Sequence, residues 1–153
     1  MMSVLQITMG TLGSLGFSIL FNVRGNKLFF TALGGALSWA LFLLLEAAVP
    51  SEFARYFISA FFVAVYAEAL ARLMKTPATM FLIPSIIPHI PGGALYRTMR
   101  YALERQWDAC FSQAFYTIKL ALGLALGIVA VLSILNVLEI ILKAKRSNKE
   151  NAL

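Results

Sequence analysis

The chain is poor in charged residues. Only 13% of its 153 residues are charged, whereas 60% are hydrophobic. In a soluble domain, about a quarter of the residues are usually charged. The gaps between the long apolar stretches are also too short to form a soluble domain of their own. The composition therefore excludes an ordinary soluble protein and indicates one that lies in a membrane.

Cysteine and histidine are almost absent. The single cysteine, Cys110, excludes a disulfide within the chain. The single histidine, His89, has no second histidine and no cysteine cluster beside it, so we expect no metal site and no cofactor. Ser85 and His89 are four residues apart, but prolines stand near both and no orienting acid is evident. We therefore do not expect an enzyme.

Charge is missing altogether from residues 1–23, which also lack the basic start and small-residue cleavage site of a signal peptide. We interpret them as a retained membrane span. The net charge of +6 comes with a basic tail, residues 143–153. We interpret its charges as cytoplasmic anchors and not as a nucleic-acid site. The chain then consists of one helical membrane domain, residues 1–142, and this tail.

Five segments are apolar enough to cross a membrane, for which a helix needs about 20 residues. They are residues 1–21, 28–45, 53–74, an interrupted segment from 78 onward, and 116–142. A tight turn at residues 24–27 separates the first two, and Ser51 is a suitable cap for the third. We expect an all-α membrane protein with about five transmembrane helices, the fourth broken by proline and glycine.

The interrupted segment is the most informative part of the chain. Residues 76–96 have no charge, yet they contain Pro84, Pro88, Pro91 and the pair Gly92-Gly93. Proline breaks a helix, and irregular backbone at membrane depth must be buried in protein or line a cavity. Broken helices of this kind often form the ligand sites of transporters. The pattern therefore predicts a protein that transports a molecule.

An amphipathic helix is predicted directly after the break. Charged residues from Arg97 to Asp108 recur at helical spacing, and the residues between Leu95 and Cys110 on the other side are largely apolar. Tyr101 and Trp107 suit a lipid headgroup layer. Pro91 is a good first-turn residue for this helix.

The distribution of lysine and arginine predicts the orientation. With five crossings and the tail inside, eight of the 13 basic residues lie inside and five outside, and the N-terminus is outside. If the fourth segment only enters and returns, these numbers reverse. The rule therefore favours five crossings. An odd number of spans in so short a chain also fits one half of a transporter whose other half is a separate polypeptide.

Every predicted span has a face of small residues on which helices can approach closely. The last span contains Gly123 and Gly127 in a GxxxG motif, and the third contains an alanine stripe from Ala60 to Ala71. Ordinary packing within the bundle explains these faces. A contact with a partner subunit is the alternative.

Glu68 is the only acid well inside a continuous span. An ionisable group at that depth usually has a function, and a desolvated carboxyl group can exchange protons near neutral pH. We therefore consider Glu68 a candidate for coupling transport to protons. A pair with Arg72, one turn later, is the structural alternative.

A substrate site is predicted at the break itself. His89 can bind substrate or relay a proton, although a lone histidine often only packs in a core. If a helix starts at Pro91, the free amides of Gly92 and Gly93 attract a carboxylate, with Arg97 one turn further. Pro88 belongs to the same backbone, and Tyr96 offers a hydrogen bond. A kinked span whose arginines contact headgroups is the alternative.

The interrupted segment carries a resemblance. IPSIIPHIPGGALYRTM, residues 83–99, resembles the proline-rich signature of the threonine/serine exporter family. GFSILFNVRGNKL, residues 16–28, is similar to the end of the first span in the same proteins, and EALARLMKTPA, residues 68–78, matches in its place. The first loop reads Val23-Arg24-Gly25, where relatives often have a proline. The resemblance covers nearly the whole chain and is to the small membrane subunit, equivalent to the C-terminal half of the full-length exporter.

The resemblance implies a function that composition does not show. It implies a bacterial inner-membrane subunit that exports threonine and serine with a larger partner, which has its own membrane half and a non-membrane domain. Some members are linked to dicarboxylates such as succinate, and the proton gradient is the expected energy source. We therefore expect a half-transporter for small carboxylate-bearing metabolites. A non-transporting accessory subunit and a homomeric channel, formed as a homo-oligomer, remain as alternatives.

Overall fold

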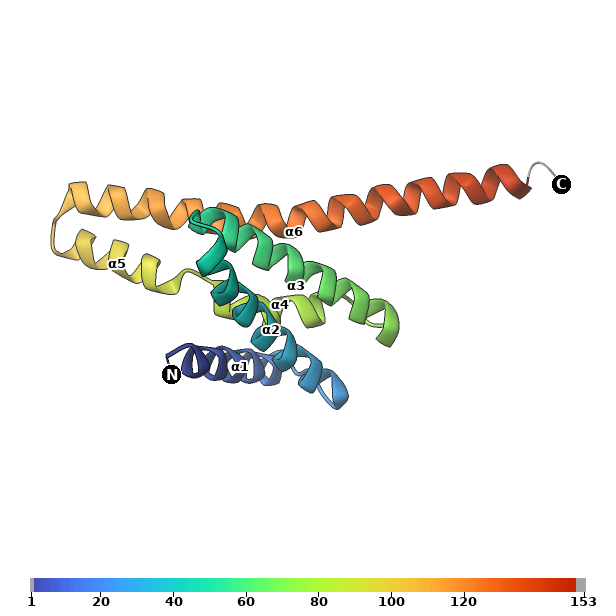
Figure 1. Ribbon diagram of the computed structural model, residues 1–153, viewed down its shortest axis with the longest axis horizontal. Helices are drawn as coiled ribbons and strands as arrows, with labels where there is room; N and C mark the ends of the chain where they lie inside the picture. Colours follow the sequence, from blue (N-terminus) through green and yellow to red (C-terminus); the bar gives the residue numbers. More distant parts are fainter. Residues whose placement is uncertain (1, 151–153) are drawn as a thin grey trace.

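The protein is helical throughout the part that the computed structural model describes, which is residues 2–150, with side chains for residues 4–144. The elements are the α-helices α1 (Met2–Leu20), α2 (Asn26–Ala48), α3 (Glu52–Met74), α4 (Thr79–Ile86), α5 (Gly92–Leu103) and α6 (Trp107–Glu150), with a short 3-10 helix, η1 (Ile87–His89), between α4 and α5. Figure 1 shows a bundle of α1 to α4 that packs on the middle of the long helix α6. The predicted tail starts within α6, and residues 151–153 lie outside the described part.

Within the described residues, α2, α3 and α6 are each long and apolar enough to cross a membrane. Two shorter apolar stretches, Val4–Leu20 and Thr79–His89, complete the set. The prediction of an all-α membrane protein is confirmed. The exposed surface of the bundle is rich in leucine, isoleucine, valine and phenylalanine, as expected for helices that face lipid.

The turn between α1 and α2 begins earlier than predicted. Asn22 has a left-handed backbone with a φ of 58°, and the amide of Val23 donates to the carbonyl of Ser18, so α1 already ends before Phe21 in a Schellman-type turn. Gly25 has a φ of 66° and a ψ of −148°, a backbone conformation that essentially only glycine adopts. These two residues therefore reverse the chain direction.

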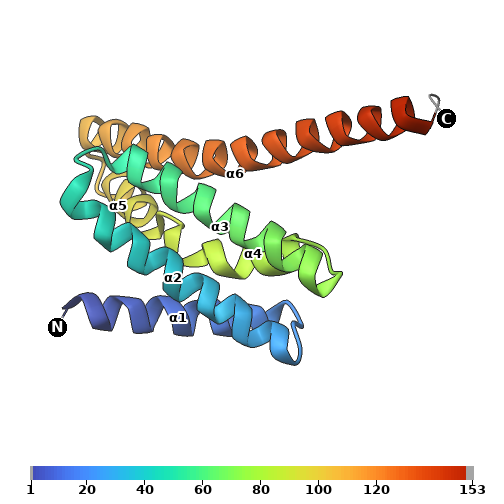
Figure 2. The same cartoon turned by 45° about the vertical axis from the view of Figure 1, so that its right-hand side comes forward.

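Helices α3 and α6 run parallel, which determines the path of the chain between them. Near the start of α3, the Glu52 carboxylate accepts a hydrogen bond from the Tyr116 hydroxyl of α6. Near its end, Arg72 pairs with Glu139 of α6 at 3.9 Å. Two parallel helices require that the segment between them returns across the bundle. Figures 1 and 2 show this path, with α4 starting beside the end of α3 and α5 leading to the start of α6. The fourth segment therefore returns along the bundle, and its crossing of the membrane stays a prediction.

The glycines of the GxxxG motif form the contact between these two helices. A Cβ atom at Gly123 would lie 2.9 Å from the carbonyl oxygen of Phe53, and one at Gly127 would lie 2.5 Å from that of Phe57. The alanine stripe of α3 is buried. The Cβ of Ala60 would lie 2.9 Å from a Cβ added at Gly127. This face is therefore used within the chain, in agreement with the bundle-packing interpretation.

The amphipathic helix is confirmed but is shorter than predicted. Helix α5 ends at Leu103, because Arg105 adopts a left-handed φ of 57° and the amide of Gln106 donates to the carbonyl of Tyr101. These bonds form a Schellman motif that stops the helix. Trp107 to Cys110, predicted to continue it, belong instead to α6, which begins nine residues before the predicted start at Tyr116.

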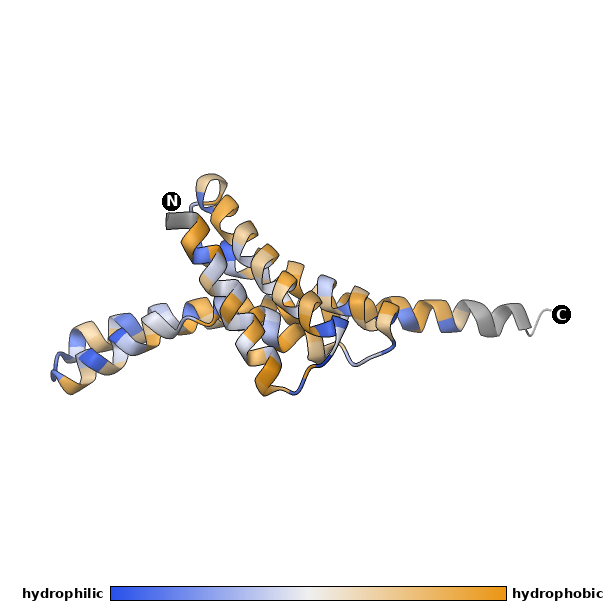
Figure 3. Ribbon diagram, turned by 90° about the horizontal axis from the view of Figure 1, so that it is seen from below, coloured by the Kyte–Doolittle hydropathy of each residue, from blue (hydrophilic) through white to orange (hydrophobic). Residues whose placement is uncertain are grey.

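A helical hairpin of α5 and the start of α6 projects from the bundle. Helix α6 has 44 residues, so it is roughly 66 Å long at 1.5 Å per residue, about twice the hydrocarbon thickness of a bilayer. Thr98 of α5 contacts Thr117 of α6, and the Cys110 thiol donates to the Thr98 carbonyl. Figure 3 shows that the hairpin is much more hydrophilic than the bundle. Figure 1 shows that the hairpin extends away from the bundle on one side.

Candidate functional site

The helix break is built by the prolines and lies at the centre of the bundle. Pro84 is inside α4, and Pro88 is in η1, after which Ile90 is extended with a ψ of 123°. Pro91 caps α5. A proline cannot donate to the preceding turn, so the chain changes direction twice within a few residues. The 3-10 helix η1 packs against α1, α2 and α4, and His89 within it is buried. Ile90 and the pair Gly92-Gly93 are exposed, so only the first part of the irregular backbone is buried within this chain.

His89 is fully buried at this break, with an exposed fraction of 0%. Its ring makes edge-to-face contacts with Trp39 at 5.4 Å and Phe42 at 5.7 Å, both on α2, and with Tyr56 of α3 at 6.5 Å between ring centroids. Trp39 and Phe42 are three residues apart, so they share one face of α2. Two helices thus enclose the imidazole in aromatic rings.

Neither ring nitrogen of His89 makes a hydrogen bond of normal geometry in the described part of the chain, although the backbone of Ser38 lies near the ring. An unsatisfied buried polar group costs about 1–3 kcal/mol, and each such group calls for an explanation. A neutral imidazole offers one donor and one acceptor. The enclosed ring is therefore equipped to bind a polar group that enters the bundle.

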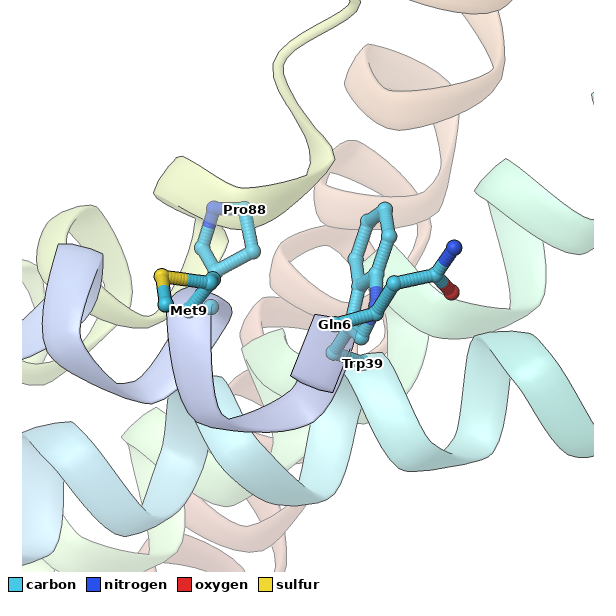
Figure 4. A pocket seen from close by; sticks show the side chains of 5 residues that line it. Gln6, Met9, Trp39 and Pro88 are labelled. Carbon is cyan, nitrogen blue, oxygen red and sulfur yellow. The ribbon is translucent and has the colours of Figure 1, made fainter. Parts of the chain in front are cut away.

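A pocket of about 230 Å³ lies beside the break. Figure 4 shows it between Pro88 of η1, Trp39 of α2, and Gln6 and Met9 of α1. Gly10 completes the lining, and a Cβ at this position would lie 3.5 Å from Pro88. The pocket reaches the Trp39 ring that contacts His89. The predicted break therefore has a cavity next to it.

The start of α5 forms a second group of predicted residues. The amide of Leu95 donates to the Pro91 carbonyl, which leaves the first-turn amides, such as that of Gly93, without helical partners. A Cβ at Gly93 would lie 3.9 Å from the Arg97 guanidinium, so this side chain lies over the helix start. Gly92 is exposed, with open space where a side chain would stand. Its amide is not free as predicted, because it donates to the Ile90 carbonyl at 2.7 Å.

Tyr96 lies apart from the other predicted residues. Its side chain is 66% exposed, whereas His89, seven residues earlier, is fully buried. The structure therefore brings Pro88 and His89 together in the bundle, and Gly93 and Arg97 together at the start of α5. Tyr96 joins neither group.

Glu68 lies at the other end of α3. It is twelve residues from Tyr56, the residue of α3 that contacts His89, or roughly 18 Å along the helix. Its carboxylate lies 4.0 Å from the Arg72 guanidinium, which also pairs with Glu139. Glu68 also lines a pocket of about 440 Å³ between the end of α3 and α6. The predicted pair with Arg72 is therefore present, beside an open pocket.

The sequence analysis missed an ionic cluster at the start of α3. The side chain of Arg55 is only 10% exposed, and its guanidinium lies 3.7 Å from Glu46 of α2 and 3.6 Å from Glu52. It also stacks over the Phe42 ring at 5.5 Å, the same ring that contacts His89. The spacing of Glu52 and Arg55, with Glu46 across a short loop, was the available signal.

The sequence analysis also missed a seam of buried hydroxyl groups. Ser18 donates to the Thr31 hydroxyl at 2.6 Å, and Ser85 donates to the Thr31 carbonyl at 3.1 Å. The hydroxyl of Ser38 contacts the Ser85 carbonyl at 3.4 Å. These bonds join α1, α2 and α4 in the core of the bundle. No three histidine, cysteine, aspartate or glutamate side chains lie close enough to hold a metal among the described residues.

Comparison with known families gives one finding. A family model described as "Threonine/Serine exporter, ThrE" matches residues 6–134. The match runs from the first turns of α1 through most of α6 and so includes the helix break, the aromatic enclosure of His89 and the cluster around Arg55. Neither the curated proteins nor the solved structures gave a match.

Proposed function

Because the chain belongs to the threonine/serine exporter family, we propose that it forms one half of a secondary exporter for small metabolites that carry a carboxylate, with threonine and serine as the first candidates. The family implies an exporter-type transporter in a membrane, which agrees with the all-helical apolar fold. The half-transporter role, the substrate and the proton coupling are our proposals.

The observation that carries this proposal is the buried, unpaired imidazole of His89 at the helix break. Its donor and acceptor suit the hydroxyl or amino group of a small polar substrate. The pocket at Pro88 gives access to the ring that contacts His89. Gly92, Gly93 and Arg97 form an entry point for a carboxylate on the hairpin side, because a helix start and a guanidinium both attract anions. Tyr96 contributes at most to the rim of this entry.

A second chain completes the transporter in this proposal. Five crossings leave the two ends of the domain on opposite sides, and inverted-repeat transporters pair two halves of opposite topology. The partner is a larger subunit with a membrane half and a non-membrane domain. The excess of lysine and arginine at the α1–α2 turn, the α3–α4 turn and the tail supports a cytoplasmic location for these segments and an N-terminus outside.

Proton coupling is assigned to Glu68. Its carboxylate faces a pocket at the proposed cytoplasmic end, and its nearest basic group, Arg72, is shared with Glu139. Transport then uses the proton gradient through a residue remote from the substrate site.

Export from cells tests the function. Labelled threonine, serine and succinate are loaded into cells that contain this chain, the larger subunit, or both. We expect threonine or serine export only when both chains are present. Export by the larger subunit alone would contradict the half-transporter role and favour an accessory subunit.

Flux through this chain alone would favour a homomeric channel, provided that it is insensitive to collapse of the proton gradient. Export of succinate in place of threonine and serine would move the proposal to dicarboxylates. These outcomes therefore separate the half-transporter from each of its alternatives.

A further inference from the structure

The cluster at the start of α3 suggests which carboxylates this protein binds. Arg55 is nine-tenths buried, and its Nε has no hydrogen-bond partner among the described residues. Its ion pairs, at 3.7 and 3.6 Å, are longer than hydrogen bonds. A buried guanidinium is stable only when its charge and its donors are satisfied. Arg55 is therefore poised to accept a better partner.

A carboxylate in direct contact is the partner that best fits a guanidinium, because the two planar groups form two parallel charge-assisted hydrogen bonds. The acids around Arg55 add a second requirement. Glu46 and Glu52 together carry two negative charges against the single positive charge of Arg55, so the cluster has a net charge of −1. Glu52 is held in place by the hydroxyl of Tyr116. A ligand with an ammonium group beside its carboxylate gives Arg55 a carboxylate and gives the two glutamates a positive charge.

We propose that Arg55, Glu52 and Glu46 bind the α-carboxylate and α-ammonium groups of a zwitterionic amino acid. This inference rests on the proposed function and selects among its substrates. A dicarboxylate would place a second negative charge beside two glutamates, which Coulomb repulsion disfavours. The cluster thus selects amino acids over succinate.

The position of the cluster connects it to His89. The guanidinium of Arg55 stacks on one side of Phe42, and the same ring contacts the imidazole at 5.7 Å. Tyr56, next to Arg55 in the chain, contacts both rings. Arg55 therefore lies one aromatic layer from the break. In this proposal the cluster binds the carboxylate and ammonium groups of the amino acid. The side chain of the amino acid then points toward the imidazole of His89.

The experiment uses the full chain in nanodiscs of neutral lipid, with equilibrium binding of radiolabelled threonine. Unlabelled threonine, threonine amide, 3-hydroxybutyrate and succinate compete for the site. The amide lacks the carboxylate, and 3-hydroxybutyrate lacks the ammonium group. We expect each of the three analogues to compete at least about tenfold more weakly than threonine. The amide leaves the buried guanidinium of Arg55 without a carboxylate, and the other two bring no ammonium group to Glu46 and Glu52.

Two variants assign the groups. Arg55→Gln should remove the preference for threonine over its amide, and Glu52→Gln should remove the preference over 3-hydroxybutyrate. Arg72→Gln is the matched control, because Arg72 also pairs with two glutamates at similar distances but is 57% exposed. It should keep both preferences. Arg55→Lys, which keeps the charge without the planar fork, should retain part of the preference if Arg55→Gln does not fold.

Three results would overturn the inference. The amide or succinate competing as well as threonine would show that the site does not read a zwitterion. An unchanged preference in Arg55→Gln would exclude Arg55 while leaving the proposed function intact. If Arg55→Gln only alters the response to added anionic lipid, the guanidinium binds a headgroup instead. Absence of saturable binding of threonine, serine and succinate by the unaltered chain together with the larger subunit would contradict the proposed function itself.

Discussion

At the scale of single residues, the core of the bundle keeps several polar atoms without partners. Trp39 Nε1, the Ser59 hydroxyl and both nitrogens of His89 are buried and unpaired in the described part of the chain. Each costs stability that an apolar residue would not. They come from α2, α3 and η1, and two of them are in direct ring contact. Such departures from good core packing are expected at functional sites.

Replacement of His89 by phenylalanine separates stability from function. His89→Phe keeps an aromatic ring among Trp39, Phe42 and Tyr56 and removes the two unpaired nitrogens, so thermal unfolding should be unchanged or shifted upward. Threonine export should fall by at least about tenfold, which corresponds to a loss of about 1.4 kcal/mol of interaction. Tyr56→Phe, which removes a hydroxyl and keeps the ring, is the control. Normal export by His89→Phe would exclude the imidazole from the transport path.

The role of Glu68 is tested by comparison with Glu139, the other acid that pairs with Arg72. Glu68→Gln should change the free energy of unfolding by less than about 1 kcal/mol, because its ion pair is long and partly exposed. Export driven by an imposed pH gradient should nevertheless be lost. Glu139→Gln removes the second partner of Arg72 and should keep proton-driven export. Equal effects of the two changes would mean that Glu68 acts only through the ion pair.

At the scale of elements, the close approach of α3 and α6 depends on glycine. Gly127→Leu places a side chain against the Phe57 carbonyl, 2.5 Å from its first carbon atom, and should destabilise the protein by about 1–3 kcal/mol or more. Gly13→Leu on α1 is the control, because a Cβ there meets nothing within 4 Å. Thermal unfolding in detergent measures both. A stable Gly127→Leu protein with impaired assembly would instead assign this face to a partner.

The apolar helices could be predicted because hydropathy alone identifies them, and α2, α3 and α6 are long enough to cross a membrane. The break was also predictable, since proline and glycine act on their own local backbone, although Pro84 is accommodated inside α4. The ends of the hairpin were not. Arg105 shows no sequence sign of a left-handed conformation, which glycine or asparagine would have given. Helical spacing of charges therefore continued through a turn and concealed the start of α6.

The candidate site was predictable only in part, because local sequence determines some of its residues and tertiary contacts determine the others. His89 and the start of α5 stand in one segment, so their relation is local. The burial of Arg55 depends on Phe42 and Glu46, which belong to a different helix. From the sequence, Arg55 was one of five basic residues on its side of the membrane. Only tertiary contacts distinguish a buried guanidinium from an exposed anchor.

At the scale of the whole molecule, the parallel arrangement of α3 and α6 determines the topology. The start of α3 contacts α6 through Glu52 and Tyr116, and the end of α3 contacts it through Arg72 and Glu139. Helix α5 leads away from the bundle at the end where α6 begins (Figure 1). We therefore propose that the α2–α3 loop and the hairpin turn lie on one side of the membrane. In the same proposal, the α1–α2 and α3–α4 turns lie on the other side.

Labelling of introduced cysteines tests this arrangement in whole cells. In a Cys110→Ser background, which keeps a donor for the Thr98 carbonyl, single cysteines replace Pro50, Glu104, Lys27 or Pro77. We expect an impermeant maleimide to reach the first two from outside and the last two only after permeabilisation. A cysteine at 104 that labels with the one at 77 would mean that the fourth segment returns to its side of entry. In that case α3 and α6 could not be parallel, and the half-transporter topology would fail with them.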